Sequence, residues 1–281
     1  MSLILVRYAE IGLKSRPVRR RFESILRENI TKMLIRDGIE SLISSDEGRL
    51  YLECDDVEKA TVSLRRVFGV ASISVTEVFE GGLSEICSSA AEYSKGRLQQ
   101  GQSFAVRPRR EGVHEYTSVD LGREVGSAIF LANEFLDVRV NLRDPDVEFF
   151  VEVRQKKAYL FTDYLSGPGG LPMGSQGKVV AVVDNNNDAL AAWLMMRRGC
   201  EALILGQGPL ELLQRYDTDL RFYKGRFEDI YKDHDILGVV YGYTIDEMQN
   251  IEQAHNPELT SFHPLVGMSK EEIGKMFVDM V

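Results

Sequence analysis

The chain has 281 residues, of which 44% are hydrophobic and 27% charged, a composition typical of a globular protein with two or three domains. No apolar run approaches the length of a membrane span, so the sequence predicts neither a membrane-embedded segment nor a membrane partner. The net charge of −9 does not by itself exclude a nucleic-acid partner, because the acidity is concentrated: residues 178–281 carry 10 basic and 17 acidic side chains, whereas residues 1–177 carry 24 and 26.

The first 80 residues predict a small α/β unit. The expected elements, in order, are a strand over 3–8, a helix over 18–35, hairpin strands at 42–43 and 50–52, a helix over 57–68 and a strand over 71–79. This β-α-β-β-α-β order is typical of a ferredoxin-like unit. The N-terminal run MSLILVRYAEIG has no basic region and no cleavage site, so it predicts the first strand rather than a signal peptide.

Residues 81–165 predict a second α/β unit. The expected elements are helices over 83–98 and 120–133 and strands over 103–107, 147–153 and 158–162. The second helix carries Leu121, Val125 and Ile129 on one face, as an amphipathic helix does. The last two strands alternate like a hairpin around Lys156 and Lys157.

Residues 166–177 form a linker, because the run GPGGLPMG excludes a helix or a regular strand. Beyond the linker, apolar runs alternate with helical segments, which predicts a parallel sheet with helices on both faces. The expected strands are 179–183, 202–205, 220–223 and 236–241, and helices are expected over 188–198, over 244–254 and after Ser269, which makes a capping box with Glu272.

A polar turn joins the first of these strands to the first helix, and it reads Asp184-Asn185-Asn186-Asn187-Asp188. A strand, a tight turn and a helix N-terminus hold phosphate in many α/β proteins, because backbone N–H groups and the helix dipole converge on an anion. The turn is therefore the candidate nucleotide loop, which we take as residues 184–189.

The surrounding stretch, 177–199, resembles the PP-loop of the tRNA 4-thiouridine synthetases, also called tRNA sulfurtransferases or thiamine-biosynthesis proteins. The shared residues are Gly177-Lys178-Val179, Asp188 and Met195-Met196-Arg197-Arg198-Gly199. The similarity extends to Glu10–Lys14 in the first unit and to Asn141–Asp146 in the second, which resembles a THUMP RNA-binding domain.

The resemblance implies an α/β protein with four segments. These are an N-terminal ferredoxin-like domain over 1–80, a THUMP domain over 81–165, a linker over 166–177 and a Rossmann-like PP-loop domain of the adenine nucleotide alpha hydrolase type over 178–281. It also implies ATP with Mg²⁺, a nucleophilic cysteine and bound tRNA, because the family activates a tRNA uracil with ATP and delivers sulfur from a cysteine.

The loop departs from the family signature, Ser-Gly-Gly-X-Asp-Ser. Asp184 replaces the first serine, Asn185 and Asn186 replace the glycines, and Ala189 replaces the second serine. Asparagine tolerates the left-handed backbone that glycine adopts, so the turn can survive. The Asp184 carboxylate, however, would repel a phosphate oxygen about 4 Å away by roughly 4 kcal/mol at an effective dielectric near 20. Half of that energy would weaken ATP binding by more than about tenfold.

Two other interpretations of the loop need no nucleotide. Asp184, Asn186 and Asp188 match the first three ligands of a calcium loop, but Ala189 and Met195 stand where its glycine and its bidentate glutamate belong. The other interpretation is a plain strand-to-helix turn in which Asp188 is the N-cap.

Catalytic and metal-binding residues are not predicted. Cys54, Cys87 and Cys200 are scattered without metal-ligand spacing, which fits a reducing cytoplasm, and we expect a cytoplasmic protein. Cys200 is the only cysteine after residue 177 and lies at no matching family position, so a small buried hydrophobic role suits it better.

Basic side chains are the candidate RNA contacts, since neutralised phosphates dominate such affinity. One group follows the first strand, a second belongs to the THUMP-like part, and a third is the lysine pair between its last two strands. They are Lys14, Arg16, Arg19, Arg20 and Arg21; Arg107, Arg109, Arg110 and Arg123; and Lys156 and Lys157. By analogy the ligand is the acceptor end of tRNA, and the alternative is a solvated charged face.

We interpret the chain as a tRNA-binding relative of these synthetases, without a cofactor, in which ATP-dependent adenylation is impaired or lost. One alternative is an active tRNA sulfurtransferase that uses ATP and Mg²⁺ in 4-thiouridine or thiamine sulfur transfer. The other is a scaffold or regulatory subunit whose acidic C-terminal domain contacts protein. An active sulfurtransferase, a sulfur donor protein or a second copy of the chain are the open partners.

Overall fold

The computed structural model describes residues 3–46, 48–224, 227, 230, 234–247, 249–250 and 259–280. The chain forms two compact units, each built from several segments. Unit 1 comprises Met1–Val6, Leu50–Val57 and Ile73–Leu165, and unit 2 comprises Arg7–Arg49, Glu58–Ser72 and Ser166–Val281.

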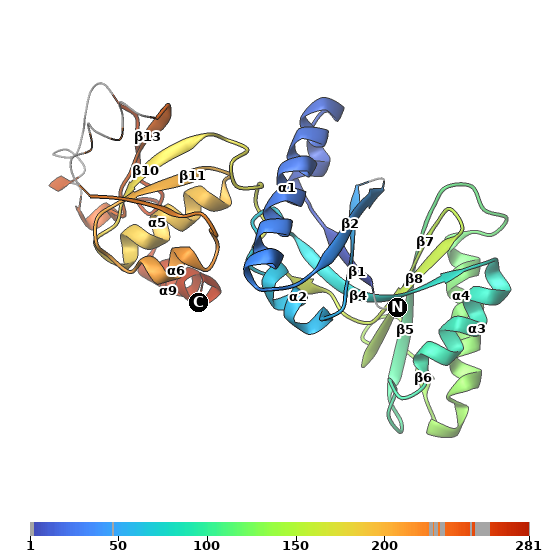
Figure 1. Cartoon of the computed structure of the whole chain (residues 1–281). Coiled ribbons are helices and arrows are strands. Elements are labelled where there is room, and N and C mark those ends of the chain that lie inside the picture. Colours follow the sequence, from blue (N-terminus) through green and yellow to red (C-terminus); the bar gives the residue numbers. More distant parts are fainter. Residues whose placement is uncertain are drawn as a thin grey trace. The chain divides into compact units, whose positions relative to one another are not determined.

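Unit 1 is built on a mixed sheet in the order β3-β1-β4-β8-β7-β5-β6 (Figure 1). Its elements are β1 (Leu3–Arg7), β3 (Arg49–Cys54), β4 (Ser72–Glu80), α3 (Leu83–Ser94), β5 (Ser103–Glu111), α4 (Ser118–Ala132), the 3₁₀ turn η2 (Glu134–Leu136), β6 (Arg139–Val140), β7 (Val147–Arg154) and β8 (Lys157–Phe161). Strands β1 and β3 pair antiparallel, as do β7 and β8, whereas β5 and β7 run parallel.

Side-chain alternation gives this sheet two apolar faces. Helices α3 and α4 cover one face of the sheet (Figure 1). Phe104 and Phe149 point to that face, where Leu121, Val125 and Ile129 of α4 complete the core. Tyr159 and Phe161 belong to the opposite face, in a second cluster that includes Leu3, Leu5 and Tyr51. Successive residues of β8 are therefore buried on opposite faces of the sheet, with Ala158 and Leu160 in the first cluster and Tyr159 and Phe161 in the second.

Unit 2 contains a parallel sheet in the order β12-β11-β10-β13-β14 (Figure 1). Its elements are η1 (Glu10–Leu13), α1 (Arg16–Arg36), β2 (Ser41–Asp46), α2 (Val57–Leu64), β10 (Lys178–Val182), α5 (Asn186–Arg197), β11 (Glu201–Leu205), α6 (Leu210–Gln214), β12 (Arg221–Tyr223), β13 (Ile236–Val240), η3 (Ile245–Glu247), β14 (Ser261–Phe262) and α9 (Lys270–Met280). Strand β9 (Leu165–Ser166) lies where the chain passes from unit 1 to unit 2.

The core of unit 2 encloses β10 on both faces. Val179, Val180 and Ala181 are fully buried, since residues of α5, α6 and α9 pack on one face and Ile230 packs on the other. Phe68, which follows α2 in the sequence, enters the same core: its ring lies 5.1 Å from that of Tyr216 and 5.6 Å from that of Trp193. Aromatic packing thus joins the segment after α2 to the parallel-sheet region within unit 2.

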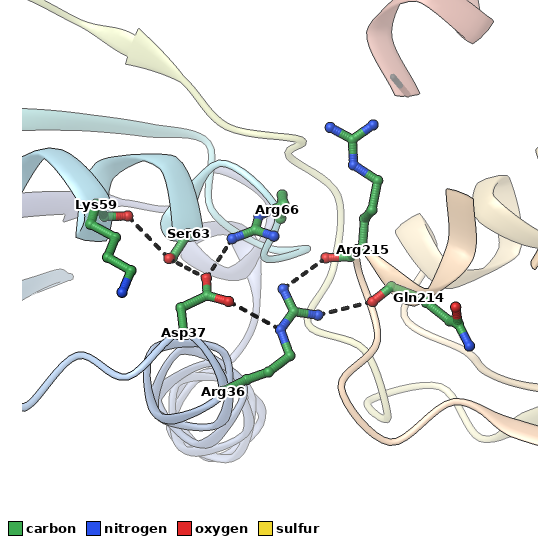
Figure 2. A network of polar contacts seen from close by, with 7 residues as sticks. All are labelled: Arg36, Asp37, Lys59, Ser63, Arg66, Gln214 and Arg215. Atoms are coloured by element: carbon green, nitrogen blue, oxygen red, sulfur yellow. Dashed lines mark hydrogen bonds and ion pairs between the residues drawn. The ribbon is translucent and has the colours of Figure 1, made fainter. Parts of the chain in front are cut away.

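A polar network in unit 2 centres on Asp37, at the end of α1 (Figure 2). Its carboxylate accepts hydrogen bonds from Ser63 and Arg66 and pairs with Arg36 Nε at 3.2 Å. Arg36 also donates to the backbone oxygens of Gln214 at 2.9 Å and Arg215 at 3.4 Å, which are carbonyls at the end of α6. Figure 2 shows that one guanidinium group therefore joins α1 to α6. Its positive charge is also favourable at the C-terminus of a helix.

Replacing Asp37 with alanine is expected to lower the free energy of unfolding by about 2 kcal/mol, because two guanidinium groups and a hydroxyl lose a shared acceptor. Burial acts to raise the pKa of Asp37, but the hydrogen bond from Ser63, the Arg66 charge and Arg36 outweigh it and hold the pKa below its usual value. A lowered pKa stabilises the fold above about pH 4, and this contribution is lost as the pH falls through the lowered value.

Urea denaturation at pH 7 and at acidic pH measures both effects. Asp55→Ala, which removes an exposed carboxylate, is the matched control and is expected to change stability by less than about 0.5 kcal/mol. A variant of Asp37 that is as stable as the parent chain at pH 7 contradicts the role assigned to the network.

The fold class predicted from the sequence is confirmed: the chain is α/β, and its C-terminal part is a parallel sheet. The predicted helix over 83–98 ends at Ser94, and the one over 57–68 ends at Leu64, because backbone turns close both segments early. The predicted helix over 244–254 begins as the short turn η3, and residues 248 and 251–258 lie outside the described part of the chain. The domain boundaries stay predictions. No helix among the described residues is both long enough and apolar enough to cross a membrane.

Candidate functional site

The candidate site lies at the carboxyl end of β10, the central strand of the parallel sheet. Strand β11 follows β10 in sequence and pairs on one side, whereas β13 pairs on the other (Figure 1). The strand order therefore reverses at β10, which makes this position a topological switch point. Open α/β sheets bind ligands in the crevice at such a point. Residues 184–188, which we call the 184–188 loop, occupy this position between β10 and α5.

A capping box formed by Asn185 and Asp188 holds the loop, and Asp188 is not the N-cap of α5. Asn185 is the N-cap of α5, and its Oδ1 accepts a hydrogen bond from Asp188 N at 3.1 Å. In return Asp188 Oδ2 accepts from the backbone N–H groups of Asp184 at 3.1 Å and Asn185 at 3.2 Å. The interpretation of Asp188 as N-cap is therefore wrong, because α5 begins two residues earlier than predicted, at Asn186.

Asp188 also links the loop to β13. Its Oδ1 accepts a hydrogen bond from Gly242 N at 3.0 Å, and the Asp188 side chain is buried. One carboxylate thus satisfies three backbone N–H groups around the loop. The Asp188 carboxylate therefore fixes the conformation of the loop.

Two glycines that follow the neighbouring strands pack against the backbone of residues 183–188. A Cβ on Gly206, whose φ is +129°, would meet the carbonyl oxygen of Val183 at 2.3 Å. A Cβ on Gly242 would lie 2.4 Å from Asp188 N. Neither position accepts a side chain, because the segments after β11 and β13 approach the loop too closely.

Side-chain exposure separates the members of the predicted loop. Asp184, Asn185 and Asn186 are exposed, Asn187 is half-buried, and Asp188 and Ala189 are buried. The calcium interpretation finds no support, because Asp188 points to backbone N–H groups while Asp184 and Asn186 lie in solvent. Among the described residues, no group of three or more His, Cys, Asp or Glu side chains could hold a metal ion.

Three aromatic rings, which the sequence did not single out, lie next to the loop. Tyr241 and Tyr243 flank Gly242 after β13, and His263 follows β14. Their planes are within 7° to 21° of parallel, and their centroids are 5.5, 5.7 and 6.2 Å apart. We call Tyr241, Tyr243 and His263 the aromatic platform.

None of the three cysteines, all of which lie in the described residues, is an activated thiol. Cys200 is 3% exposed and belongs to the core of unit 2, and burial raises the pKa of its thiol to about 11. Burial also raises the pKa of Cys54 and of Cys87, helped by the carboxylates of Asp56 and Asp55 beside Cys54 and of Glu124 beside Cys87. A nucleophilic thiol needs the opposite environment, because the thiolate is the reactive form.

Alkylation measures this difference. At pH 8 about one Cys200 thiol in a thousand is ionised, given a pKa of about 11, so iodoacetamide is expected to leave Cys200 unmodified in the folded chain. The rate at Cys54 and Cys87 should lie below that of free cysteine and rise with pH. Urea-unfolded protein, in which all three should react, is the control, and rapid labelling of any of them at pH 7 contradicts the assignment.

The predicted RNA contacts of the first group surround the start of α1. Lys14, Arg16, Arg20 and Arg21 are exposed, and we call them the α1 basic cluster. Arg19 differs, because its guanidinium group donates to the backbone oxygens of Gly12 at 2.6 Å and Lys14 at 3.5 Å. The first turn of α1 holds no acidic residue. Since the helix dipole is positive at this end, these arginines form a strongly positive surface.

Contacts of the second group divide between the two faces of β5. Arg109 is exposed, whereas Arg107 pairs with Glu148 at 2.6 Å and donates to the oxygen of Leu142 at 3.0 Å. Strand alternation places Arg110 on the other face, where its charge acts on Tyr116 and lowers the pKa of that phenol against the larger effect of burial. Arg109 is thus the arginine of this strand best placed to meet a phosphate.

The remaining candidates are exposed but differ in their partners. Arg123 on α4 pairs with Asp120 at 3.3 Å and Glu124 at 3.2 Å, beside an apolar cavity of about 510 Å³ between α4 and β5. Lys157 pairs with Glu80 at 3.7 Å. Lys156, in the turn between β7 and β8, is exposed without an ion pair to the described residues. The RNA contacts stay predictions.

Comparisons with known proteins agree with the architecture. Residues 3–74 match the family described as the ThiI ferredoxin-like domain, and residues 82–163 match the THUMP domain. A probable tRNA sulfurtransferase of Methanosarcina mazei is 41% identical over 202 residues, covering 70% of this chain and 50% of the relative. The corresponding protein of Thermococcus kodakarensis is 31% identical over 331 residues, covering 97% of this chain and 86% of the relative. The chain thus spans about half the length of the Methanosarcina relatives.

Solved structures show the same fold. The crystal structure of PH1313 from Pyrococcus horikoshii has a TM-score of 0.85 at 29% identity and covers 98% of both chains. A 4-thiouridine synthetase, solved as an RNA complex with bound ATP, has a TM-score of 0.79 at 21% identity, covering 100% of this chain and 85% of that one. With a relative matched over most of its length and both N-terminal domains matched, the resemblance seen in the sequence is confirmed, and the chain belongs to the tRNA sulfurtransferase family.

Proposed function

We propose that this chain binds tRNA without activating it with ATP. The observation that carries the proposal is the 184–188 loop, in which an exposed Asp184 replaces a neutral residue and exposed Asn185 and Asn186 replace two glycines. A triphosphate at this loop would face the Asp184 carboxylate. The residues present therefore do not fit ATP with Mg²⁺.

The charge of the loop supports the proposal that ATP is not bound. Asp184 is exposed at the loop, and no basic side chain within the loop offsets it. Repulsion between its carboxylate and a phosphate oxygen about 4 Å away reaches roughly 4 kcal/mol at an effective dielectric near 20. Even after screening to half that value, ATP affinity would fall by more than about tenfold.

The cysteines support the proposal that this chain does not deliver sulfur itself. Sulfur delivery requires a thiolate near bound RNA, yet Cys200 is buried in the core of unit 2 and the thiol pKa of all three cysteines is raised. In this proposal a separate sulfurtransferase or sulfur donor protein carries out the chemistry. The three free cysteines also suit the cytoplasm, where thiols stay reduced.

RNA binding rests on the family and on surface charge. The relatives are named tRNA sulfurtransferases, and the THUMP match covers residues 82–163. In unit 2 the α1 basic cluster exposes Lys14, Arg16, Arg20 and Arg21, and in unit 1 Arg109 and Lys156 are exposed. We propose that these side chains contact phosphates of the tRNA acceptor end.

Two titrations of the full chain test the proposal. Calorimetry with ATP and Mg²⁺ should give no saturable heat below millimolar concentration, and a micromolar Kd would show an active nucleotide site instead. Labelled tRNA should bind more weakly as salt rises, because released counterions drive phosphate contacts. Absent or salt-insensitive binding would favour a protein scaffold.

A further inference from the structure

A cavity of about 610 Å³ lies in unit 2 beside the C-terminal end of α5, the end opposite to the 184–188 loop. That volume falls within the range of small-molecule sites. Most of its lining is apolar and comes from α5, from β14 and from α9 with the residues before it. We call this lining the apolar wall, and it comprises Leu194, Met195, Phe262, Met268 and Met276. Because methionine side chains are flexible, the wall can adapt to the shape of an apolar group.

Two guanidinium groups line the same cavity. Arg197 is half-buried and Arg198 is exposed, and neither makes an ion pair with the described residues. The guanidinium carbon of Arg197 lies 5.5 Å from the centroid of the Trp193 ring, and this contact orients the group. Glu10 is the one acidic side chain among the described residues that line the cavity. The charged lining therefore has a net positive charge.

The backbone beside these arginines is fixed by the linker. The carbonyl oxygen of Arg197, at the end of α5, accepts a hydrogen bond from Leu171 N at 3.0 Å. Gly170 also lines the cavity, and it has a φ of +76°. A Cβ on Gly170 would lie 2.1 Å from the same carbonyl oxygen, so only glycine permits this close approach. The two arginines thus belong to a rigid element, which lowers the entropic cost of binding a ligand there.

His263 adds a polar ring to the cavity without adding charge. The ring stacks on that of Tyr241, with the centroids 5.7 Å apart. Burial lowers the pKa of His263, so the ring is neutral at neutral pH. Its Nδ1 is buried and has no hydrogen-bond partner among the described residues. Of the lining residues that the structure describes, Arg197 and Arg198 therefore supply all of the positive charge.

From these contacts we infer that the cavity binds a small amphipathic anion. Its head, a carboxylate or a phosphate, contacts Arg197 and Arg198, and its apolar body lies against the apolar wall. A guanidinium group can bind either head through two parallel hydrogen bonds. Arg197 lies about 16 Å along α5 from Asn186, so this site is distinct from the 184–188 loop. The inference goes beyond the proposed function, because it needs neither tRNA binding nor the loss of ATP binding.

Calorimetric titration of the full chain with five probes tests whether both parts of the ligand are needed. The probes are octanoate, octyl phosphate, octanol, octylammonium and inorganic phosphate. Each of the two anionic octyl probes is expected to bind at least about tenfold more tightly than octanol, which has no charge, and inorganic phosphate, which has no apolar body. Octylammonium should bind more weakly than octanol, because the arginines repel it. The tighter of the two anionic octyl probes identifies the head group.

Three variants locate the site. Arg197→Gln is expected to weaken binding of the tighter anionic probe by about tenfold and to leave octanol binding within about twofold, which also shows that the variant is folded. Met276→Asp places a carboxylate in the apolar wall and should weaken the same probe by at least about tenfold. Arg221→Gln removes an exposed guanidinium group of β12 that does not line this cavity, and it is the matched control.

Four outcomes overturn the inference. They are octanol binding as tightly as octanoate and octyl phosphate, unchanged affinity for both anionic octyl probes in Arg197→Gln, an equal loss of affinity in Arg221→Gln, and no binding of either anionic octyl probe at about 10 mM. Labelled tRNA provides a further check. If Arg197→Gln weakens tRNA binding as much as it weakens probe binding, the two arginines serve RNA phosphates instead, and the inference is also overturned.

Discussion

Replacing Asp184 with serine and both Asn185 and Asn186 with glycine is expected to raise the affinity for ATP with Mg²⁺ by more than about tenfold. The change removes the exposed carboxylate and the two side chains that crowd the turn. Calorimetric titration of the parent chain and the variant measures the gain directly. Asp184→Asn alone isolates the charge and should account for most of it.

The triple variant should keep the stability that this measurement needs. Asn185 is the N-cap of α5, and replacing such a residue by glycine costs only a few tenths of a kcal/mol, so the variant is expected to fold. Asn187→Gly, in the first turn of α5, is the matched control and should leave ATP affinity unchanged. If the triple variant gains no affinity, Asp184 is not what keeps ATP from the loop, and the electrostatic account is wrong.

The location of the candidate loop could be predicted from the sequence, because local patterns determine it. The β-branched run of β10, the polar turn and the apolar helix α5 all appear within 177–199, and their order predicts the loop. The first residue of α5 could not be predicted as well. Asp184 to Asp188 offers five consecutive residues that can cap a helix, and only the hydrogen bonds show that Asn185 is the cap.

Long-range contacts account for what the sequence missed. Gly242 lies 54 residues beyond Asp188, so no local pattern shows that one carboxylate joins the loop to β13. The aromatic platform combines two tyrosines with His263, which reaches them only because the two-residue strand β14 pairs with β13. Strands as short as β6, β9 and β14 carry no period of their own and take their register from neighbours.

The same difference between local patterns and long-range contacts applies to the basic residues. The sequence pattern singled out arginines at the start of α1 and on β5, but it could not separate those with internal partners from those without. Arg19 supports the turn η1, and Arg107 joins Glu148 and Leu142. The residues exposed at the N-terminus of α1 oppose the helix dipole, which costs roughly 0.3–1 kcal/mol for each nearby charge. Such a cost is explained if the cluster binds an anion.

Replacing Arg16, Arg20 and Arg21 with glutamate is therefore expected to lower tRNA affinity by about 100-fold or more at low salt, and to reduce the slope of log Kd against log salt by about three. The acidic side chains should also stabilise α1, because they complement its dipole, so loss of binding is not loss of fold. Fluorescence anisotropy with labelled tRNA at several salt concentrations measures both quantities. Arg221, Lys224 and Lys275 are exposed in the acidic C-terminal part, and reversing them to glutamate changes the net charge equally. If that control weakens binding as much as the α1 variant, general charge rather than this cluster attracts the RNA.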